Sequence, residues 1–129
     1  MPEKIFVDTS GFFAFLNQDD LHHEEAKAQF GSGSRVTSNY IFDELMTLLT
    51  ARGQKDFSVS FGAELRTGKD VKYHFLTLTE EEKSWQLYKK YRDHPLSFTD
   101  CTTLVLLREH RASKLLSFDE DLVRIAQNL

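Results

Sequence analysis

The sequence predicts a single α/β domain built on a mainly parallel sheet. Short apolar segments with strand character alternate along the chain with segments whose apolar residues recur at helical spacing. The first strand, residues 4–8, carries an unbroken apolar triplet that runs into Asp8, as expected for a strand buried on both faces of a parallel sheet. Such alternation favours parallel strands joined by right-handed helical crossovers. A length of 129 residues suits one domain, residues 1–129.

The individual elements follow from hydrophobic spacing, capping residues and helix breakers. Thr37 or Ser38 can cap a long helix that ends at Gly53, and Thr79 can cap a helix that runs to about Arg92. The expected helices span residues 11–16, 21–30, 38–53, 55–67, 79–92, 99–110 and 120–128. The expected strands after the first span residues 35–37, 71–78 and 114–118.

Composition and charge narrow the possible functions. No apolar run approaches the roughly 20 residues needed to span a bilayer, and the N-terminus lacks the shape of a signal peptide, so we expect a cytoplasmic protein without membrane association. The single cysteine, Cys101, excludes an intrachain disulfide and a cysteine zinc cluster. The net charge of −4 does not by itself indicate nucleic-acid binding. Four acids gathered on a divalent cation would, however, leave the remaining charges balanced.

Four acidic residues fall where a shared site is expected. In parallel α/β sheets, sites form beyond the carboxyl ends of the strands, and Asp8 follows the first strand while Asp119 follows the last. Glu44 borders the apolar stripe of its helix, whereas the adjacent Asp43 is expected to face solvent. Asp100 lies in the first turn of its helix and shares a face with apolar residues.

Carboxylates brought together without a matching base repel one another unless a cation binds them. Hard divalent cations such as Mg²⁺ and Mn²⁺ prefer oxygen ligands. Such ions can orient a water, help to deprotonate it and neutralise charge on a phosphate being cleaved. A group made of acids alone therefore predicts phosphodiester chemistry more than peptide hydrolysis.

Each of the four acids also has a purely structural interpretation. Asp8 can open an Asx turn, and Glu44 can pair with a base on the edge of its helix. Asp100 and Asp119 can cap the helices that begin beside them. The prediction of a site therefore depends on the four residues together.

Several polar residues beside the acids are assigned supporting roles. Ser10 and Thr99 either act as turn and cap hydroxyls or orient a ligand carboxylate. Asp121 either belongs to the first turn of the last helix or replaces Asp119 as the fourth acid. Arg35 and Arg52 are the candidates for holding the phosphate backbone of a nucleic acid.

The histidines and the large aromatic residues are assigned no role in a site. His22 and His23 are interpreted as surface residues, and His74 and His94 lack a ligand partner at metal spacing in the sequence. The aromatic residues of the helix predicted at 79–92 are interpreted as core; they are Trp85, Tyr88 and Tyr91.

The segments around the four acids resemble those of PIN-domain ribonucleases. They are FVDTSG with Asp8, SNYIFDELMTLL with Glu44, LSFTDCTTLVLLREH with Asp100 and LLSFDEDL with Asp119. Their order and spacing are similar to the acidic quartet of that family, and the short single-domain form resembles its VapC-type toxins. The resemblance implies a three-layer α/β/α domain with a central, mainly parallel sheet of four to five strands. It also implies a homodimer that cleaves RNA with Mg²⁺ or Mn²⁺ and is blocked by a small antitoxin.

Carried over by position, the resemblance assigns a role to each acid. Asp8 and Asp100 match the direct metal ligands. Glu44 and Asp119 match acids that act directly or through water, and Glu44 is expected to help deprotonate the attacking water. Ser10 and Thr99 fill polar positions beside the acids.

Two alternatives of other classes are retained. A haloacid-dehalogenase-like phosphatase would use Asp8 as a nucleophile, but it requires a second acid two residues on, where this chain has Ser10. A PIN-like RNA-binding module would keep the fold without turnover, and the complete quartet speaks against it. A trapped phospho-aspartate at Asp8 would favour the phosphatase, and a metal titration combined with an RNA cleavage assay separates the binding module from the nuclease.

Overall fold

The computed structural model describes residues 3–31, 33–110 and 112–129. Strands and helices alternate along this part of the chain as the sequence predicts. The strands are β1 (Lys4–Val7), β2 (Ser34–Ser38), β3 (Val71–His74) and β4 (Lys114–Leu116). The helices are α1 (Thr9–Leu16), α2 (His23–Phe30), α3 (Asn39–Ala51), α4 (Lys55–Arg66), α5 (Leu78–Lys90), α6 (Phe98–Glu109) and α7 (Glu120–Ala126).

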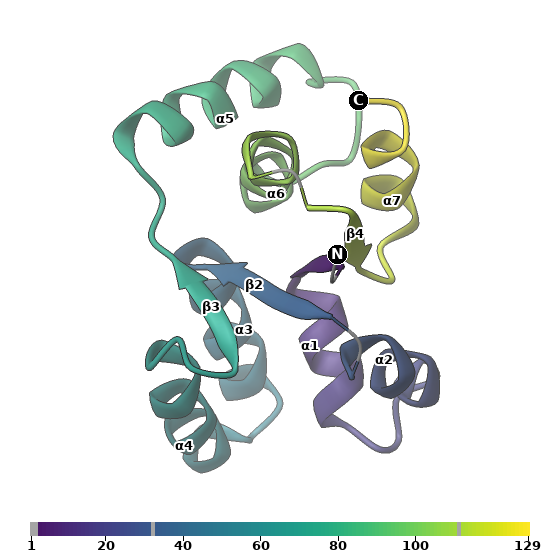
Figure 1. The fold of residues 1–129 in the computed structure, drawn as a ribbon, viewed down its shortest axis with the longest axis vertical. Coiled ribbons are helices and arrows are strands. Elements are labelled where there is room, and N and C mark those ends of the chain that lie inside the picture. Colours follow the sequence, from purple (N-terminus) through teal and green to yellow (C-terminus); the bar gives the residue numbers. More distant parts are fainter. Residues whose placement is uncertain (1–2, 32, 111) are drawn as a thin grey trace.

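The four strands form one parallel sheet in the order β3-β2-β1-β4. Figure 1 shows α1 to α4 on one side of this sheet and α5 to α7 on the other, which confirms the predicted three-layer α/β/α architecture. Strand β1 lies inside the sheet, where Phe6 pairs with Val36 on one side and Leu115 on the other. The apolar triplet of β1 is at most 1% exposed, because helices cover both faces of the strand.

Two apolar clusters hold the layers together. The larger packs the sheet against α1 and α3 and includes Phe12, Leu45 and Leu49. The smaller packs α5, α6 and α7 against one another and includes Leu104 and Leu122. Within the described part of the chain, none of the helices is both long enough and apolar enough to cross a membrane.

Helix boundaries differ from the prediction where a capping group lies earlier than expected. Helix α5 is capped by Thr77 rather than Thr79, because the Thr77 hydroxyl accepts from the Glu80 N–H while the Glu80 carboxylate accepts from the Thr77 N–H. The preceding strand therefore stops at His74. Helix α1 begins at Thr9, two residues before the predicted start, because Asp8 caps it.

Candidate active site

Asp8 leaves the end of β1 as the N-cap of α1 and is only 4% exposed. Its Oδ1 accepts hydrogen bonds from the Gly11 N–H and the Ser10 hydroxyl, both at 2.9 Å. Its Oδ2 accepts from the Ser117 hydroxyl at 2.7 Å, across from the end of β4. These bonds hold the carboxylate in a single orientation at the carboxyl edge of the sheet, the edge where the sequence predicts a site.

Gly11 permits the close approach of α1 to β4 that this arrangement needs. A Cβ at this position would lie 2.3 Å from the carbonyl oxygen of Leu116. No side chain can be accommodated at that distance without moving backbone, so only glycine fits. The sequence TSG after Asp8 therefore provides one hydroxyl, one amide and the clearance that bring Asp8 and Ser117 together.

The loop after β4 is joined to the Asp8 loop by the same two serines. The Ser10 hydroxyl accepts from the Phe118 N–H at 2.9 Å, and the Ser117 hydroxyl accepts from the Asp119 N–H at 3.1 Å. Asp119 caps α7 through its Oδ1, which accepts from the N–H groups of Asp121 and Leu122. Asp8 and Asp119 are thus connected through Ser117.

The other two acids come from α3 and α6. Glu44 lies one turn into α3, is partly buried, and accepts a hydrogen bond from the Thr9 hydroxyl. Asp100 lies in the first turn of α6, where its Oδ2 accepts from the Ser97 N–H at 3.0 Å in a capping box. As predicted, Asp43 beside Glu44 is exposed.

Electrostatic coupling shows that the structure brings these acids together. Burial raises the pKa of Asp8 from 3.8 to about 6; hydrogen bonds from Gly11, Ser117 and Ser10 oppose the shift, and repulsion by Asp100 adds to it. Burial also raises the pKa of Asp100, and repulsion by Asp119 and Glu44 adds to that shift. Among the described residues, none of the four acids forms an ion pair with a basic side chain.

The structural and functional interpretations of these acids are compatible. Asp8 and Asp119 accept from first-turn amides of α1 and α7, and Asp100 accepts from the amide of Ser97, the N-cap of α6. All three carboxylates are therefore held at helix N-termini. Amides at a helix N-terminus favour negative charge. Capping therefore orients these carboxylates and does not compete with a role in a site.

Among the supporting residues, the structure separates those that contact the acids from those that do not. Ser10 bonds Asp8 as predicted. Thr99 forms a hydrogen bond through its backbone carbonyl, which accepts from the Thr102 hydroxyl at 2.6 Å. Asp121 pairs with Arg124 at 3.0 Å, and the acid that acts on Asp100 is Asp119.

Three hydroxyl residues that the sequence analysis missed take part in the site. Ser117 and Thr9 bond Asp8 and Glu44, and Ser97 forms the capping box with Asp100. For Ser117 a signal was available in the sequence: it directly follows an apolar strand and precedes an acid by two residues.

The two arginines proposed for RNA binding lie elsewhere. Arg35 is the second residue of β2, near the end of the strand opposite Ser38. Its guanidinium donates to the Phe30 carbonyl at 2.7 Å. Arg52 is the C-cap of α3, two turns beyond Glu44, and stacks on the Phe13 ring at 5.2 Å. The structure therefore does not bring either arginine to the acids.

Three further expectations about isolated residues are wrong. His23 is not a surface residue, since its side chain is 14% exposed and its Nδ1 bonds the Ala14 carbonyl. His74 does have potential metal ligands as neighbours, because Glu80 and His110 lie beside it. Trp85 and Tyr88 are not core residues.

Trp85 and Tyr88 belong to an exposed aromatic strip. They are 45% and 41% exposed and stack on each other with ring centroids 5.8 Å apart. Tyr88 contacts Phe98 at 6.0 Å, and Phe98 contacts Tyr40 at 5.9 Å. We call these four residues the aromatic strip. It runs from α5 to the first turn of α6, which contains Asp100, and to the first turn of α3, one turn before Glu44.

The fold and the acids agree with one family of proteins. The family model of the PIN domain matches residues 5–128, so the chain belongs to the PIN-domain family. This confirms the resemblance drawn from the sequence.

Known members of the family are similar over nearly the whole chain. Two relatives from two strains of Mycobacterium tuberculosis, each named 23S rRNA-specific endonuclease VapC20, are 32% identical over 119 residues, which is 91% of this chain and 90% of each relative. The crystal structure of Mycobacterium tuberculosis VapC20, described as a toxin that cleaves the sarcin–ricin loop, matches with a TM-score of 0.85 and 30% identity. The match covers 94% of both chains.

The residues present fit the divalent metal ions that PIN-domain nucleases use. Asp8 is buried, lacks a basic partner among the described residues and ionises against the repulsion of Asp100. A cation bound between carboxylates removes that penalty, and an all-oxygen donor set suits a hard cation.

Proposed function

We propose that this chain is a Mg²⁺- or Mn²⁺-dependent endoribonuclease of the VapC type. The observation that carries the proposal is the convergence of Asp8 and Asp100, two carboxylates whose pKa values are raised by burial and by repulsion from neighbouring acids. A protein gains nothing in stability from such a pair, so the arrangement is explained by a bound cation. The family membership and the VapC20 relatives support RNA as the substrate.

Each site residue then has a defined task. Asp8 and Asp100 would hold the metal ion, which would supply a site for orienting a water and positive charge to neutralise the scissile phosphate. Ser10 and Ser117 keep the Asp8 carboxylate oriented through its two oxygens. Asp119 supplies the fourth acid, directly or through a water.

Glu44 acts on the attacking water. The Thr9 hydroxyl orients its carboxylate, and repulsion between Glu44 and Asp100 marks the two as neighbours. Glu44 accepts a proton from the water that attacks phosphorus in line with the leaving oxygen. The P–O bond opposite that water breaks, and the leaving oxygen takes up a proton from solvent and departs as a hydroxyl group.

The aromatic strip provides the surface for RNA next to these acids. Trp85 and Tyr88 expose ring faces on which unpaired bases can stack. The Lys89 ammonium lies 5.7 Å from the Trp85 ring and is available to a phosphate. The VapC20 relatives are named for 23S rRNA, and the VapC20 crystal structure is described as that of a toxin that cleaves the sarcin–ricin loop. We propose a loop of ribosomal RNA as the substrate, because unpaired bases can stack on such a surface.

The substrate proposal is tested by mapping RNA ends. Purified protein is incubated with ribosomes and Mg²⁺, and the 5′ and 3′ ends are sequenced. We expect one dominant cut in a single-stranded loop of 23S rRNA. Dispersed cuts, or cuts confined to transfer RNA, would contradict the ribosomal assignment while leaving the nuclease assignment intact.

The nuclease assignment is tested with two substitutions. Asp8→Asn and Asp100→Asn remove charge while keeping a hydrogen-bonding side chain of the same shape, and both are expected to abolish metal-dependent cleavage. Asp43→Asn, on the exposed face beside Glu44, is the matched control and is expected to keep full activity. Full activity in either test variant would refute the assignment.

The phosphatase alternative is separated by the same proteins. Ser10 stands where that chemistry needs a second acid, and its hydroxyl bonds Asp8 instead. Phosphatase activity with a trapped phospho-aspartate at Asp8 would favour that alternative. RNA binding without cleavage in Mg²⁺ and Mn²⁺ would favour the binding module.

We further propose a homodimer and a small antitoxin partner, as in VapC-type systems. Sedimentation of the purified chain is expected to give twice the mass of 15.0 kDa. Co-expression with the product of a neighbouring short gene is expected to suppress cleavage and to yield a stable complex.

A further inference from the structure

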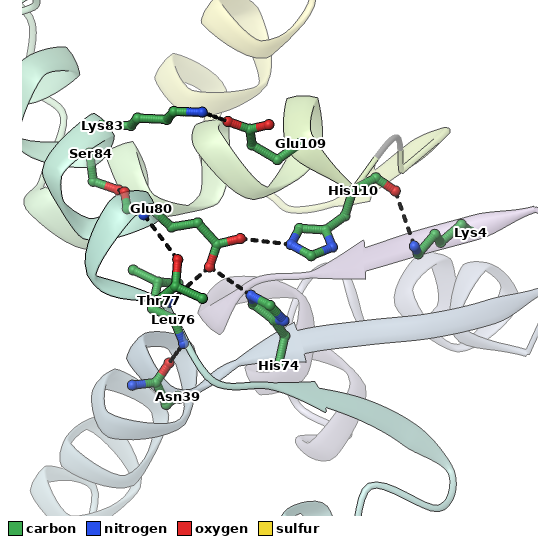
Figure 2. Close-up of polar contacts among 10 residues, drawn as sticks. All are labelled: Lys4, Asn39, His74, Leu76, Thr77, Glu80, Lys83, Ser84, Glu109 and His110. Carbon is green, nitrogen blue, oxygen red and sulfur yellow. Dashed lines mark hydrogen bonds and ion pairs between the residues drawn. The ribbon is translucent and has the colours of Figure 1, made fainter.

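Three potential metal ligands meet away from the acidic site. His74 is the last residue of β3, Glu80 lies in the first turn of α5, and His110 is the C-cap of α6. The Nε2 of His74 lies 2.8 Å from Oε1 of Glu80, and the Nε2 of His110 lies 2.9 Å from its Oε2. Figure 2 shows both imidazoles pointing at the same carboxylate. We call these residues the His–Glu–His cluster.

The cluster is compact and shielded without being closed. One ligand atom from each residue can be chosen so that all lie within 4.8 Å of one another, and in the described part of the chain this is the one group of three such residues that does so. The side chains of His74, Glu80 and His110 are 20%, 12% and 31% exposed. Solvent therefore reaches the histidines, while the carboxylate is largely buried.

Neighbouring groups hold each of the three residues in place. Glu80 Oε1 also accepts from the Thr77 N–H at 2.9 Å, as part of the capping box of α5. The carbonyl of His110 accepts from the Lys4 ammonium at 3.0 Å, which ties the end of α6 to β1. The two imidazole rings are 4.2 Å apart at 62°, so each fixes the orientation of the other. The Thr77 amide thus orients the Glu80 carboxylate, and the Lys4 contact fixes the backbone that carries His110.

The donor set differs in kind from that of the acidic site. Two imidazole nitrogens and one carboxylate oxygen are ligands that Zn²⁺ and similar transition ions prefer, whereas Mg²⁺ and Ca²⁺ prefer oxygen alone. Three protein ligands leave a fourth tetrahedral position, which water can fill from the exposed side of the histidines.

We propose that His74, Glu80 and His110 form a zinc-type metal site, separate from the acidic site. The Nε2 of His74 and the Nε2 of His110 lie 2.8 and 2.9 Å from different oxygens of the Glu80 carboxylate. One ligand atom from each residue lies within 4.8 Å of the other two. Around a tetrahedral ion with bonds of about 2.0–2.1 Å the ligand atoms would be about 3.3 Å apart, so small side-chain rotations are sufficient. Both nitrogens then bind as neutral imidazoles, with their protons on Nδ1.

A bound ion would join three elements that are distant in sequence. The ligands come from β3, α5 and α6, and the Lys4 contact adds β1. Helix α5 also carries Trp85 and Tyr88 of the aromatic strip, so zinc would stabilise the helix that presents that surface. The site itself requires no RNA and does not depend on the nuclease assignment.

The experiment is a titration of metal-free protein with ZnCl₂ by calorimetry. We expect one tight site per chain in the wild type and in Asp100→Asn, which disables the acidic site. His110→Gln and Glu80→Gln are expected to weaken that site by at least the roughly 10–100-fold that follows the loss of a supporting group. His94→Gln, an exposed histidine outside the cluster, is the matched control and is expected to bind like the wild type.

Two outcomes would overturn the proposal. One is the absence of micromolar zinc binding by the wild type, which would make the cluster a metal-free polar contact. The other is zinc binding that survives His110→Gln but is lost in Asp100→Asn, which would place zinc at the acids. X-ray absorption at the zinc edge of the wild type gives a check without variants: we expect two imidazole ligands, and a spectrum with oxygen ligands alone would refute the site.

Discussion

The acidic site and the His–Glu–His cluster contain buried carboxylates that respond to their surroundings in opposite ways. At the acidic site, burial and the neighbouring Asp100 raise the pKa of Asp8 to about 6. In the cluster, burial acts in the same direction on Glu80, but hydrogen bonds from Thr77, His74 and His110 outweigh it and lower the pKa to about 2.

Without a metal, the two regions contribute differently to the stability of the fold. Asp8 is held in place although its charge is unfavourable, so folding alone gains nothing from its ionised form. The Glu80 carboxylate is hydrogen-bonded to its neighbours and joins β3, α5 and α6 even when no ion is bound. A buried acid that costs stability is the stronger indication of a catalytic site, whereas a buried acid that is fully bonded has a structural role on its own.

The largest effect is expected from Gly11→Ala, which breaks the acidic site and leaves the cluster untouched. The new Cβ would lie 2.3 Å from the Leu116 carbonyl oxygen, so α1 must move from β4. We expect a loss of about 3 kcal/mol or more in the free energy of unfolding, measured by urea denaturation.

Gly31→Ala is the matched control for that substitution. Its Cβ would lie 3.6 Å from the Lys27 carbonyl oxygen, an ordinary contact, and we expect a change within about 1 kcal/mol. Equal losses in the two variants would show that the approach of α1 to β4 is not tight.

The next effect is a pH dependence of opposite sign in the two regions. Because folding raises the pKa of Asp8 from 3.8 to about 6, its protonated form favours the fold, and stability falls as the pH rises through this window. The full difference corresponds to about 3 kcal/mol. In EDTA, Asp8→Asn is therefore expected to be more stable than the wild type above pH 6 and to lose this advantage towards pH 4.

Glu80→Gln provides the opposite case. The pKa of Glu80 is lowered from 4.5 to about 2, so its contribution is present above pH 4.5 and is lost as the pH falls towards 2. Glu80→Gln is expected to be less stable than the wild type at neutral pH. A destabilised Asp8→Asn, or a stabilised Glu80→Gln, would reverse the comparison on which this prediction rests.

A smaller effect on cleavage should identify the fourth acid. Asp119 acts on Asp100, whereas Asp121 pairs with Arg124. We expect Asp119→Asn to lower kcat/KM about 10–100-fold, as loss of a metal-supporting group does. Asparagine caps helices as well as aspartate, so stability should be unchanged. Asp121→Asn is the control, and a larger loss in that variant would make Asp121 the fourth acid.

The smallest effect concerns the aromatic strip. Trp85→Ala removes one exposed stacking surface, and a stacked base contributes about 1–3 kcal/mol. We expect KM for an RNA loop to rise about tenfold, with kcat nearly unchanged. Phe57→Ala on α4, a side chain 44% exposed, is the control and is expected to leave KM unchanged. Equal effects of the two substitutions would exclude the strip as the RNA surface.

The amino-acid pattern was sufficient to predict the strands and the helices, and it named four acids as candidates for one site. Strand β1 could be recognised because three consecutive apolar residues need burial on both faces, and this burial places Asp8 at the carboxyl edge of the sheet. Asp100 and Glu44 could be assigned because helical periodicity places them beside apolar residues. Helix α5 was placed two residues too late because Thr77 and Thr79 are both capping residues, and only the hydrogen bonds of Glu80 distinguish them.

Only the tertiary structure decided which distant residues meet. His74, Glu80 and His110 carry no metal spacing in the sequence, because their convergence depends on how α5 and α6 pack beside the end of β3. Arg35 and Arg52 could not be excluded from the acidic site until the direction of β2 and α3 was known. Local periodicity, the capping residues and the presence of the acids could be read from the amino-acid pattern, since these features depend on near neighbours. Contacts between elements depend on packing across the whole core, and local patterns do not encode them.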